Sequence, residues 1–285
     1  MVDTYEAGRQ YNILKEYLTE LESVAVAFSG GVDSAFLLKV AADVLEKDKV
    51  VAVTAVSSLF PDREQREAEE FCNQYGIKQI KFHHNEFEIK DFKNNPPNRC
   101  YLCKRRLFEQ IISIAEENNI KHVVDGSNMD DNGDYRPGMV ATRELNIKSP
   151  LQYAGLYKED IRELSRKLGL STWNKPSLAC LASRFAYGET ISEEKLAMVD
   201  KAEQLLFDMG FSQFRVRIHG QENGLTARIE IMPEEFPRLM EEGSRKRINT
   251  YFREIGFSYV ALDLEGYRMG NMNNVIKAAC EGETK

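Results

Sequence analysis

The first half of the chain alternates between short apolar runs and longer amphipathic segments. Four runs are typical of strands: 24–28 (VAVAF), 50–56 (VVAVTAV), 78–84 (KQIKFHH) and 121–127 (KHVVDGS). The segments between them have helical spacing: 35–47, 61–76 and 103–119. This β-α repetition predicts an α/β fold, a Rossmann-like parallel sheet with helices on both faces. Ligands of such sheets bind at the carboxyl ends of the strands.

The pattern changes after a helical segment at 158–170 and an irregular segment at 171–190. The elements that follow are a helix, two alternating strands, a second helical segment and a further strand: 193–210, 214–220, 226–232, 234–256 and 257–264. They predict a smaller α+β domain. We therefore expect two domains, 1–185 and 186–285.

Composition narrows the class of protein. The 285 residues carry a formal net charge of −7 and a pI near 5.4, which argues against a general nucleic-acid coat. No run of about eighteen apolar residues is present, so no membrane span is predicted. The polar, acid-containing start does not resemble a secretory signal. We expect a cytoplasmic protein.

The stretch SGGVDS (29–34) lies between the first strand and a helix. Gly30 and Gly31 allow the backbone to approach a ligand closely. The helix N-terminus attracts phosphate, and the hydroxyls of Ser29 and Ser34 add donors. Asp33 is unusual in a pure anion site and suggests a bridging Mg²⁺. The alternative is a glycine-rich turn in which Asp and Ser only cap the helix.

The same motif resembles the signature of the PP-loop, or N-type, ATP pyrophosphatases. It is not G-x-x-x-x-G-K-[ST], because no lysine follows the glycines, and it is not G-x-G-x-x-G. The resemblance implies an adenine nucleotide α-hydrolase-like domain that binds ATP, releases pyrophosphate and adenylates an oxygen of its substrate. It implies the activation step and leaves the substrate open.

An acid-rich loop, 123–138, follows the fourth strand. Asp125, Asn128 and Asp131 are candidates for binding metal-ATP, and Arg136 and Arg143 for meeting phosphate or carboxylate. The alternative is a solvated loop without a ligand.

This loop is followed by the segment 149–188, with ACLASR at 179–184. The succession of the two resembles that in the LarE family of ATP-dependent sulfur insertases. The resemblance extends over nearly the whole chain, through RVRIH (215–219) and the segment 259–273. It implies adenylation of a carboxylate of pyridinium-3,5-biscarboxylic acid mononucleotide, a step of nickel-pincer nucleotide synthesis for lactate racemase. A cysteine-borne sulfur then displaces AMP and leaves a thiocarboxylate.

Three cysteines are candidates for carrying that sulfur. Cys100 and Cys103 form a C-x-x-C pair in NRCYLCK (98–104), and Cys180 lies in ACLASR. By resemblance, the three thiolates hold a [4Fe-4S] cluster, whose fourth iron is free to bind an exogenous sulfide from a donor. In another branch of the family a single cysteine gives up its own sulfur.

Other functions of these thiols remain open. Three thiolates also suit zinc, with a fourth ligand from His83, His84 or His219. A redox C-x-x-C pair is a further alternative. Cys72 and Cys280 are expected to be bystanders, since cysteine commonly behaves as a small core residue.

Several charged residues match the substrate region of the family. Lys104 and Arg184 flank the cysteines, where positive charge would lower a thiol pKa or hold phosphate. The resemblance assigns the substrate's phosphate and carboxylate to Arg215, Arg217 and Arg268, and an acid at the site to Glu203. The spacing alone would place these arginines on a half-exposed strand and Glu203 on the surface.

Three other functions compete with the sulfur insertase for a chain with a PP-loop. A PP-loop tRNA-thiolating enzyme would be expected to have terminal C-x-x-C pairs or a basic extension, whereas this chain is acidic. An ammonia-dependent synthetase would not need the three cysteines. An ATP-binding sensor would bind ATP without releasing pyrophosphate. By resemblance, the nucleotide-binding enzyme is expected to be a homo-oligomer, with six copies.

Overall fold

The structure is a computed structural model that describes residues 4–131, 137–176, 179–220 and 224–268. The chain divides into two compact units. The first unit is Met1–Phe92 with Pro97–Leu178, and the second is Lys93–Pro96 with Ala179–Lys285. The division after Leu178 lies close to the expected boundary near 185, and it assigns Cys180 to the second unit.

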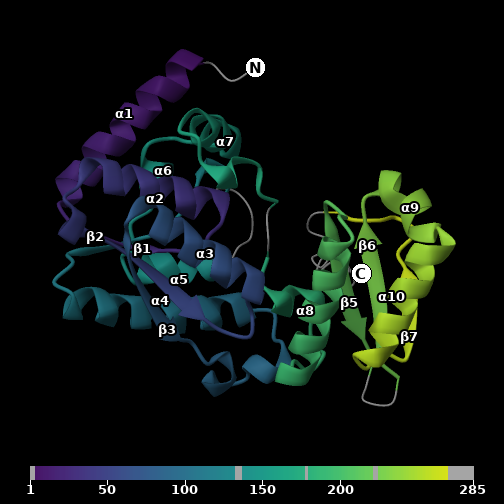
Figure 1. Cartoon of the computed structure of the whole chain (residues 1–285). Coiled ribbons are helices and arrows are strands. Elements are labelled where there is room, and N and C mark those ends of the chain that lie inside the picture. Colours follow the sequence, from purple (N-terminus) through teal and green to yellow (C-terminus); the bar gives the residue numbers. More distant parts are fainter. Residues whose placement is uncertain (1–3, 132–136, 177–178, 221–223, 269–285) are drawn as a thin grey trace, which may run out of the picture. The chain divides into compact units, whose positions relative to one another are not determined.

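A four-stranded parallel sheet forms the centre of the first unit (Figure 1). Its strands are β1 (Val24–Ala27), β2 (Val50–Val56), β3 (Lys78–His83) and β4 (His122–Val124), in the order β3-β2-β1-β4. The four predicted strands are all present, so the predicted Rossmann-like α/β fold is confirmed. Strand β1 is central, because Val24 pairs with a residue of β2 and also with one of β4.

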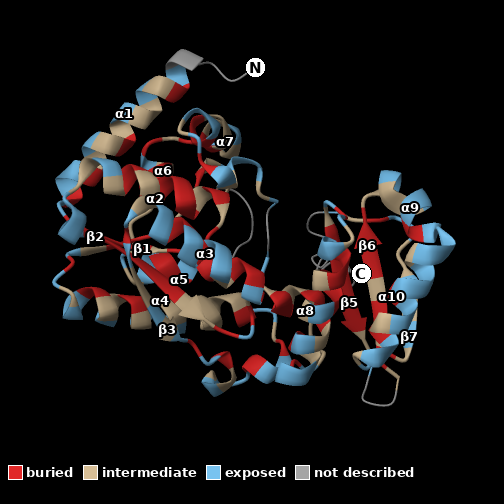
Figure 2. Ribbon diagram, viewed as in Figure 1, coloured by how far each residue is buried: buried red, intermediate tan, exposed pale blue. Residues whose placement is uncertain are grey.

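Helices cover both faces of this sheet: α1 (Thr4–Leu21), α2 (Val32–Val44), α3 (Asp62–Tyr75), α4 (Arg99–Glu117), α5 (Pro137–Glu144), α6 (Pro150–Tyr153) and α7 (Lys158–Lys167). Val24 and Val26 pack in the cluster that includes α1, α2, α3 and α7, whereas Ala25 packs with α4. Because both faces are covered, most of β1 and β2 is buried (Figure 2), and the two strands are apolar except for Thr54.

The helices α1 and α5 were not predicted from the sequence. Helix α1 buries Leu14, Leu18 and Leu21 against the sheet, and their spacing places them on one helical face. Helix α5 lies beside α4 and occupies part of the segment that was expected to be a loop.

The order of the strands creates a switch point. The chain runs outward from β1 through β2 to β3, and then returns to place β4 on the other side of β1. In open α/β sheets ligands bind at the carboxyl ends of the strands where the order reverses. Segments that follow β1 and β4 therefore meet at the expected position of a ligand.

The second unit contains a three-stranded sheet, β5 (Phe214–His219), β6 (Thr226–Ile231) and β7 (Tyr259–Leu262). Strands β5 and β6 are antiparallel, and β6 and β7 are parallel. Its helices are α8 (Glu193–Asp208), α9 (Phe236–Met240) and α10 (Glu242–Glu254). No helix among the described residues is both long enough and apolar enough to cross a bilayer.

The single helical segment expected at 234–256 was wrong, because two helices occupy it. Glu241, between α9 and α10, has φ −54° and ψ 140°, outside the helical region. Leu239 and Ile248 are both buried, at 5% and 2% exposure. Nine positions at about 100° each would direct them to opposite sides of one straight helix. The break allows both to reach the core.

Single-turn 3₁₀ helices complete the described elements: Lys47–Lys49, Glu86–Glu88, Phe92–Asn94, Met129–Asp131, Ser171–Asn174, Leu181–Arg184 and Pro233–Glu235.

Candidate functional site

The PP-loop, residues 29–34, links β1 to α2, and Gly31 is the N-cap of α2. Gly30 has φ +71°, and a Cβ there would lie 3.1 Å from the Cβ of Ala68 on α3. Only glycine meets both conditions without strain. The Ser34 hydroxyl donates to the Gly31 carbonyl at 3.2 Å and lies 3.2 Å from the Ser29 hydroxyl. The loop thus presents the N-terminus of α2, an anion site, at the switch point.

Residues after β4 approach this loop directly. A Cβ at Gly126 would lie 3.0 Å from the Ser34 nitrogen, so glycine permits the close approach. Asn128 Nδ2 donates to Asp33 Oδ1 at 3.2 Å. The structure therefore brings together the loop aspartate and the acid-rich segment, as the strand order predicts.

Two carboxylates of that segment, those of Asp125 and Asp131, accept hydrogen bonds from its own and neighbouring residues. Asp125 is buried and accepts hydrogen bonds from the hydroxyls of Ser127 and Ser149, both at 2.7 Å. Asp131 accepts from the backbone N–H of Asn128 at 3.0 Å. Their roles in binding metal-ATP stay predictions. Arg143 is exposed on α5, and Arg136 lies outside the described residues.

Two lysines at the PP-loop were not identified from the sequence. Lys158 Nζ forms an ion pair with Asp33 Oδ2. Lys175 Nζ donates to the Gly30 carbonyl at 3.1 Å and lies 2.5 Å from Glu64 and 2.6 Å from Glu67 of α3. They follow Asp33 by 125 and 142 positions, as counted from the sequence. No local pattern indicates such distant contacts.

The C-x-x-C pair lies at the start of α4. Cys100 and Cys103 are three positions apart, which places them on one face of the helix. Cys103 Sγ lies 3.8 Å from Nε2 of the buried His84, whose Nδ1 is 2.7 Å from Gln110 Oε1. The Lys104 side chain packs against Gly138 of α5, where a Cβ would lie 2.6 Å from it.

Three cysteine thiols suit the ligation of an iron–sulfur cluster. Cys100, Cys103 and Cys180 are all partly exposed, and none of the three forms a disulfide. Cys100 and Cys103 belong to the first unit and Cys180 to the second. Within the described parts of the chain, no three His, Cys, Asp or Glu side chains group as a metal site. The thiols fit a cluster by type, and their joint ligation stays a prediction.

Cys72 differs from these three thiols. It is 1% exposed in the core of the first unit, and burial raises the pKa of its thiol to about 12. A thiol with this pKa is inert near neutral pH, in agreement with the expected bystander role. Cys280 lies outside the described residues.

In the second unit, Arg184 and Glu203 form a fully buried pair. Arg184 Nε and Nη2 donate to the two Glu203 oxygens at 2.9 and 2.8 Å, and the side chains are 1% and 0% exposed. Burial raises the pKa of the Glu203 carboxyl. The positive charge and the hydrogen bonds of Arg184 lower this pKa by more, so that it lies below its usual range. Arg184 Nη1 also donates to the carbonyls of Ala179 and Cys180, at 2.7 and 3.2 Å. Glu203 is therefore not the surface residue that its spacing suggested.

Arg215 and Arg217, the two arginines of β5, are also buried, whereas the strand pattern suggested that they are half-exposed. Arg217 donates to both oxygens of Glu230, at 3.1 and 2.9 Å, and to the Ser183 carbonyl at 2.6 Å. Arg215 lies over the Tyr267 ring, 5.2 Å from its centroid. Burial, followed by the like charge of Arg184, lowers the pKa of Arg215.

Arg268 is the most accessible of the predicted substrate residues in this unit. It forms an exposed ion pair with Glu265, after β7. The substrate roles of Arg184, Arg215, Arg217 and Arg268 stay predictions.

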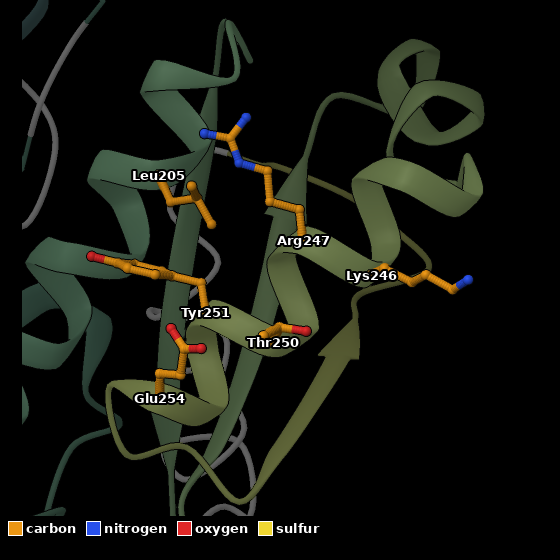
Figure 3. A pocket seen from close by; sticks show the side chains of 6 residues that line it. All are labelled: Leu205, Lys246, Arg247, Thr250, Tyr251 and Glu254. Atoms are coloured by element: carbon orange, nitrogen blue, oxygen red, sulfur yellow. The ribbon is translucent and has the colours of Figure 1, made fainter.

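One open groove of the second unit has the size of a ligand pocket, about 480 Å³, but lacks the predicted residues. It lies between α8 and α10 (Figure 3). Its lining residues are Leu205, Lys246, Arg247, Thr250, Tyr251 and Glu254. Tyr251 extends toward α8, while Lys246 extends away. The nucleotide site is predicted at the PP-loop, whose residues do not line this groove.

Comparisons with known proteins identify the family of the chain. Residues 7–112, which contain the PP-loop, match the family described as NAD synthase. The pyridinium-3,5-bisthiocarboxylic acid mononucleotide synthase of Lactiplantibacillus plantarum is 38% identical over 92% of this chain and 93% of its own length.

Two uncharacterised proteins are also similar. One, from Synechocystis, is 42% identical over 92% of this chain and 96% of its own length. The other, from Methanocaldococcus jannaschii, is 31% identical over 90% of this chain and 95% of its own length. With the PP-loop at the switch point and near full-length similarity to the synthase, the chain belongs to the LarE family of PP-loop sulfur-transferring enzymes.

Proposed function

We propose that this chain uses ATP to adenylate a carboxylate of pyridinium-3,5-biscarboxylic acid mononucleotide and then inserts sulfur to give a thiocarboxylate. The observation that carries the proposal is the 38% identity, over 92% of the chain, to a synthase of the bisthiocarboxylic acid mononucleotide. This activity belongs to nickel-pincer nucleotide synthesis.

The PP-loop supports the activation step. Triphosphate would bind at the N-terminus of α2, where Gly30 and Gly31 allow close approach and Ser29 and Ser34 donate hydrogen bonds. Asp33, held by Asn128 at 3.2 Å, would ligate the Mg²⁺ that accompanies ATP. A substrate carboxylate oxygen attacks the α-phosphorus, pyrophosphate leaves, and an acyl adenylate forms.

The residues after β4 would complete this nucleotide site. We assign Asp125, Asn128 and Asp131 to metal-ATP, with Arg136 and Arg143 as phosphate or carboxylate partners. The hydrogen bond from Asn128 to Asp33 supports the first part of this assignment.

The sulfur step would involve Cys100, Cys103 and Cys180. A sulfur nucleophile attacks the acyl carbon, the bond to the AMP oxygen breaks, and AMP leaves with the electron pair. These three thiols would hold a [4Fe-4S] cluster, which supplies transferable sulfide when bound. The alternative, which the partial exposure of each thiol also permits, is a cysteine that gives up its own sulfur.

The remaining charged residues would recognise the substrate. Lys104 follows the C-x-x-C pair on α4, and Arg268 is accessible beyond β7. Arg184, Arg215 and Arg217 would contribute positive potential from a buried network that Glu203 organises. We further propose a cytoplasmic homo-oligomer, with six copies, that receives sulfide from a donor.

Pyrophosphate release tests the activation step. We expect release that depends on the dicarboxylate mononucleotide, and its loss in Asp33→Ala. Asp43→Ala is the matched control, because Asp43 lies on the same helix and pairs with Lys39 at the surface. Release with tRNA alone would favour the thiolation rival, and ATP binding without release would favour a sensor.

Iron and sulfide analysis after anaerobic purification tests the cluster. We expect about four irons per chain, the content of a [4Fe-4S] cluster. They should be lost in Cys100→Ala and retained in Cys72→Ala. Substrate-dependent conversion by iron-free protein, with one sulfur lost from a cysteine, would favour the sacrificial mechanism.

A further inference from the structure

We infer that His84 is a positioning residue for Cys103: its imidazole accepts a hydrogen bond from the Cys103 thiol and donates one to the same sulfur when that sulfur is ligated to a metal. Gln110 makes both arrangements possible, because its amide can face the ring with either its oxygen or its nitrogen. The inference rests on the proposed role of Cys103 as a cluster ligand, and it concerns two residues outside the ligand set.

The His84 ring lies between two residues of one helix. Its Nε2 is 3.8 Å from Cys103 Sγ, and its Nδ1 is 2.7 Å from Gln110 Oε1. Cys103 and Gln110 are seven positions apart on α4, about two helical turns, so both lie on the same face of the helix. The backbone N–H of His84 donates to the Val56 carbonyl at 3.0 Å, which fixes the residue directly after β3. Because His84 is only 3% exposed, its ring has little room to turn away.

The partner of Nδ1 decides which ring nitrogen carries the hydrogen. A neutral imidazole has one N–H group and one bare nitrogen. The Gln110 oxygen faces Nδ1, and a carbonyl oxygen can only accept, so the hydrogen lies on Nδ1. Nε2 is then bare and can accept the hydrogen of the Cys103 thiol. These contacts therefore match Cys103 in its thiol form.

An amide at this position allows what a carboxylate would not. A carboxylate only accepts and would hold the hydrogen on Nδ1, whereas an amide that turns over presents its NH₂ group and donates to Nδ1. The hydrogen of the ring then lies on Nε2, next to the Cys103 sulfur. Gln110 is half-buried, so water can satisfy the amide atom that faces away from the ring. The imidazole is neutral in both arrangements, and neither leaves a buried ring nitrogen without a partner.

Ligation of the Cys103 sulfur requires the second arrangement. A ligated thiolate has no hydrogen to donate, and a bare Nε2 would face its lone pairs. When the sulfur is ligated, the thiol proton passes to Nε2, the Nδ1 proton leaves to solvent, and the ring keeps one hydrogen. The Nε2–H group then donates to the thiolate. Hydrogen bonds of this kind tune the affinity and the reduction potential of thiolate-bound metals.

Nitrogen NMR of the wild-type protein tests the change of arrangement. The chain has four histidines, so selective ¹⁵N labelling gives few signals, and those lost in His84→Gln belong to His84. In metal-free protein, magic-angle-spinning spectra should show His84 with its hydrogen on Nδ1. Addition of Cd²⁺, a soft cation that thiolates bind, should move the hydrogen to Nε2. A hydrogen that stays on Nδ1, or an Nε2 bonded directly to cadmium, would overturn the inference.

The metal affinity and the reduction potential test the donated hydrogen bond. His84→Leu removes the donor, so Cd²⁺ should bind about tenfold more weakly, and the cluster potential of anaerobically purified protein should become more negative. His84→Gln carries an amide donor that reaches about as far as Nε2, and it should restore most of both. His83→Leu is the matched control, because His83 is the exposed neighbour at the end of β3. Unchanged values in His84→Leu, or equal losses in His84→Gln, would contradict the inference.

These results are separable from a failure of the proposed function. The Cd²⁺ measurements need neither ATP, nor the sulfur-accepting substrate, nor iron. If wild type were purified without iron, the cluster proposal would fail, while the NMR spectra would still decide the role of His84.

Discussion

Arg184 and Glu203 face each other as a bidentate ion pair, with distances of 2.9 and 2.8 Å, and both side chains are withdrawn from solvent. Glu203 Oε1 also accepts the backbone N–H of Val216 at 2.9 Å. The pair thus joins the turn after Cys180 to α8 and β5. Each partner depends on the other, because an unpaired charge at this depth is costly.

Glu203→Gln should destabilise the protein strongly. Removing one charge of a buried pair costs about 3–5 kcal/mol, because the other charge is left uncompensated. Urea unfolding of wild type and variant measures the difference. Glu242→Gln is the control, since Glu242 forms an exposed pair with Lys246 and should lose at most about 1 kcal/mol. Equal losses in the two variants would contradict a special role for the buried pair.

The stabilisation by Glu203 should depend on pH with a defined sign. Its folded-state pKa lies below the usual value of about 4.3, so the unfolded chain takes up a proton first as the pH falls. The contribution is fully present above about pH 4.3 and is lost as the pH falls through the folded-state pKa. The stability difference between wild type and Glu203→Gln, followed by unfolding from pH 7 to pH 2, should be constant and then shrink in acid. A difference that grows in acid would refute the sign.

Gly30→Ala should impair the PP-loop. The substitution forces a side chain to φ +71° and places a Cβ 3.1 Å from Ala68, so the loop must shift. We expect a loss of about 1–2 kcal/mol in stability and weaker ATP binding, measured by thermal unfolding and calorimetry.

Gly8→Ala provides the opposite control. A Cβ at Gly8 meets nothing within 4 Å, and the residue lies inside α1. This change should stabilise the protein by about 0.5–1 kcal/mol and leave ATP binding unchanged. If both variants lost ATP binding equally, the loop geometry would not explain the result.

Alkylation should distinguish the partly exposed cysteines from the buried one. At pH 8 in the native metal-free protein, iodoacetamide should label Cys100, Cys103 and Cys180, which are partly exposed. Cys72 should remain unlabelled, because it is buried and its thiol pKa is raised to about 12. Peptide mass spectrometry reports each site, and all four should react in denaturant. Native labelling of Cys72 at the rate of Cys100 would disprove its burial.

The parts of the fold that depend on local pattern were predictable from the sequence. Strands β1 and β2 are apolar except for Thr54 because both faces are covered, and SGGVDS follows β1 after Phe28. Parallel strands place the PP-loop and the segment after β4 at one edge, which led correctly to the meeting of Asp33 and Asn128.

The parts that depend on distant contacts were not predictable. Lys158 and Lys175 contact PP-loop residues that lie more than a hundred positions away in the sequence. A lysine in a polar segment is otherwise expected at the surface. The burial of Arg217 and Glu203 depends on partners contributed by other elements. Similarly, the break at Glu241 follows from the need to bury Leu239 and Ile248 together.

The contacts of Arg184 with the carbonyls of Ala179 and Cys180 limit the positions that the Cys180 side chain can take. A planar guanidinium that is itself anchored to Glu203 holds the peptide units around Cys180 still. The remaining freedom of the thiol is rotation about its Cα–Cβ bond, which has three staggered positions. The Cys180 sulfur therefore has three staggered positions about a single bond, and the proposed sulfur step would start from one of them.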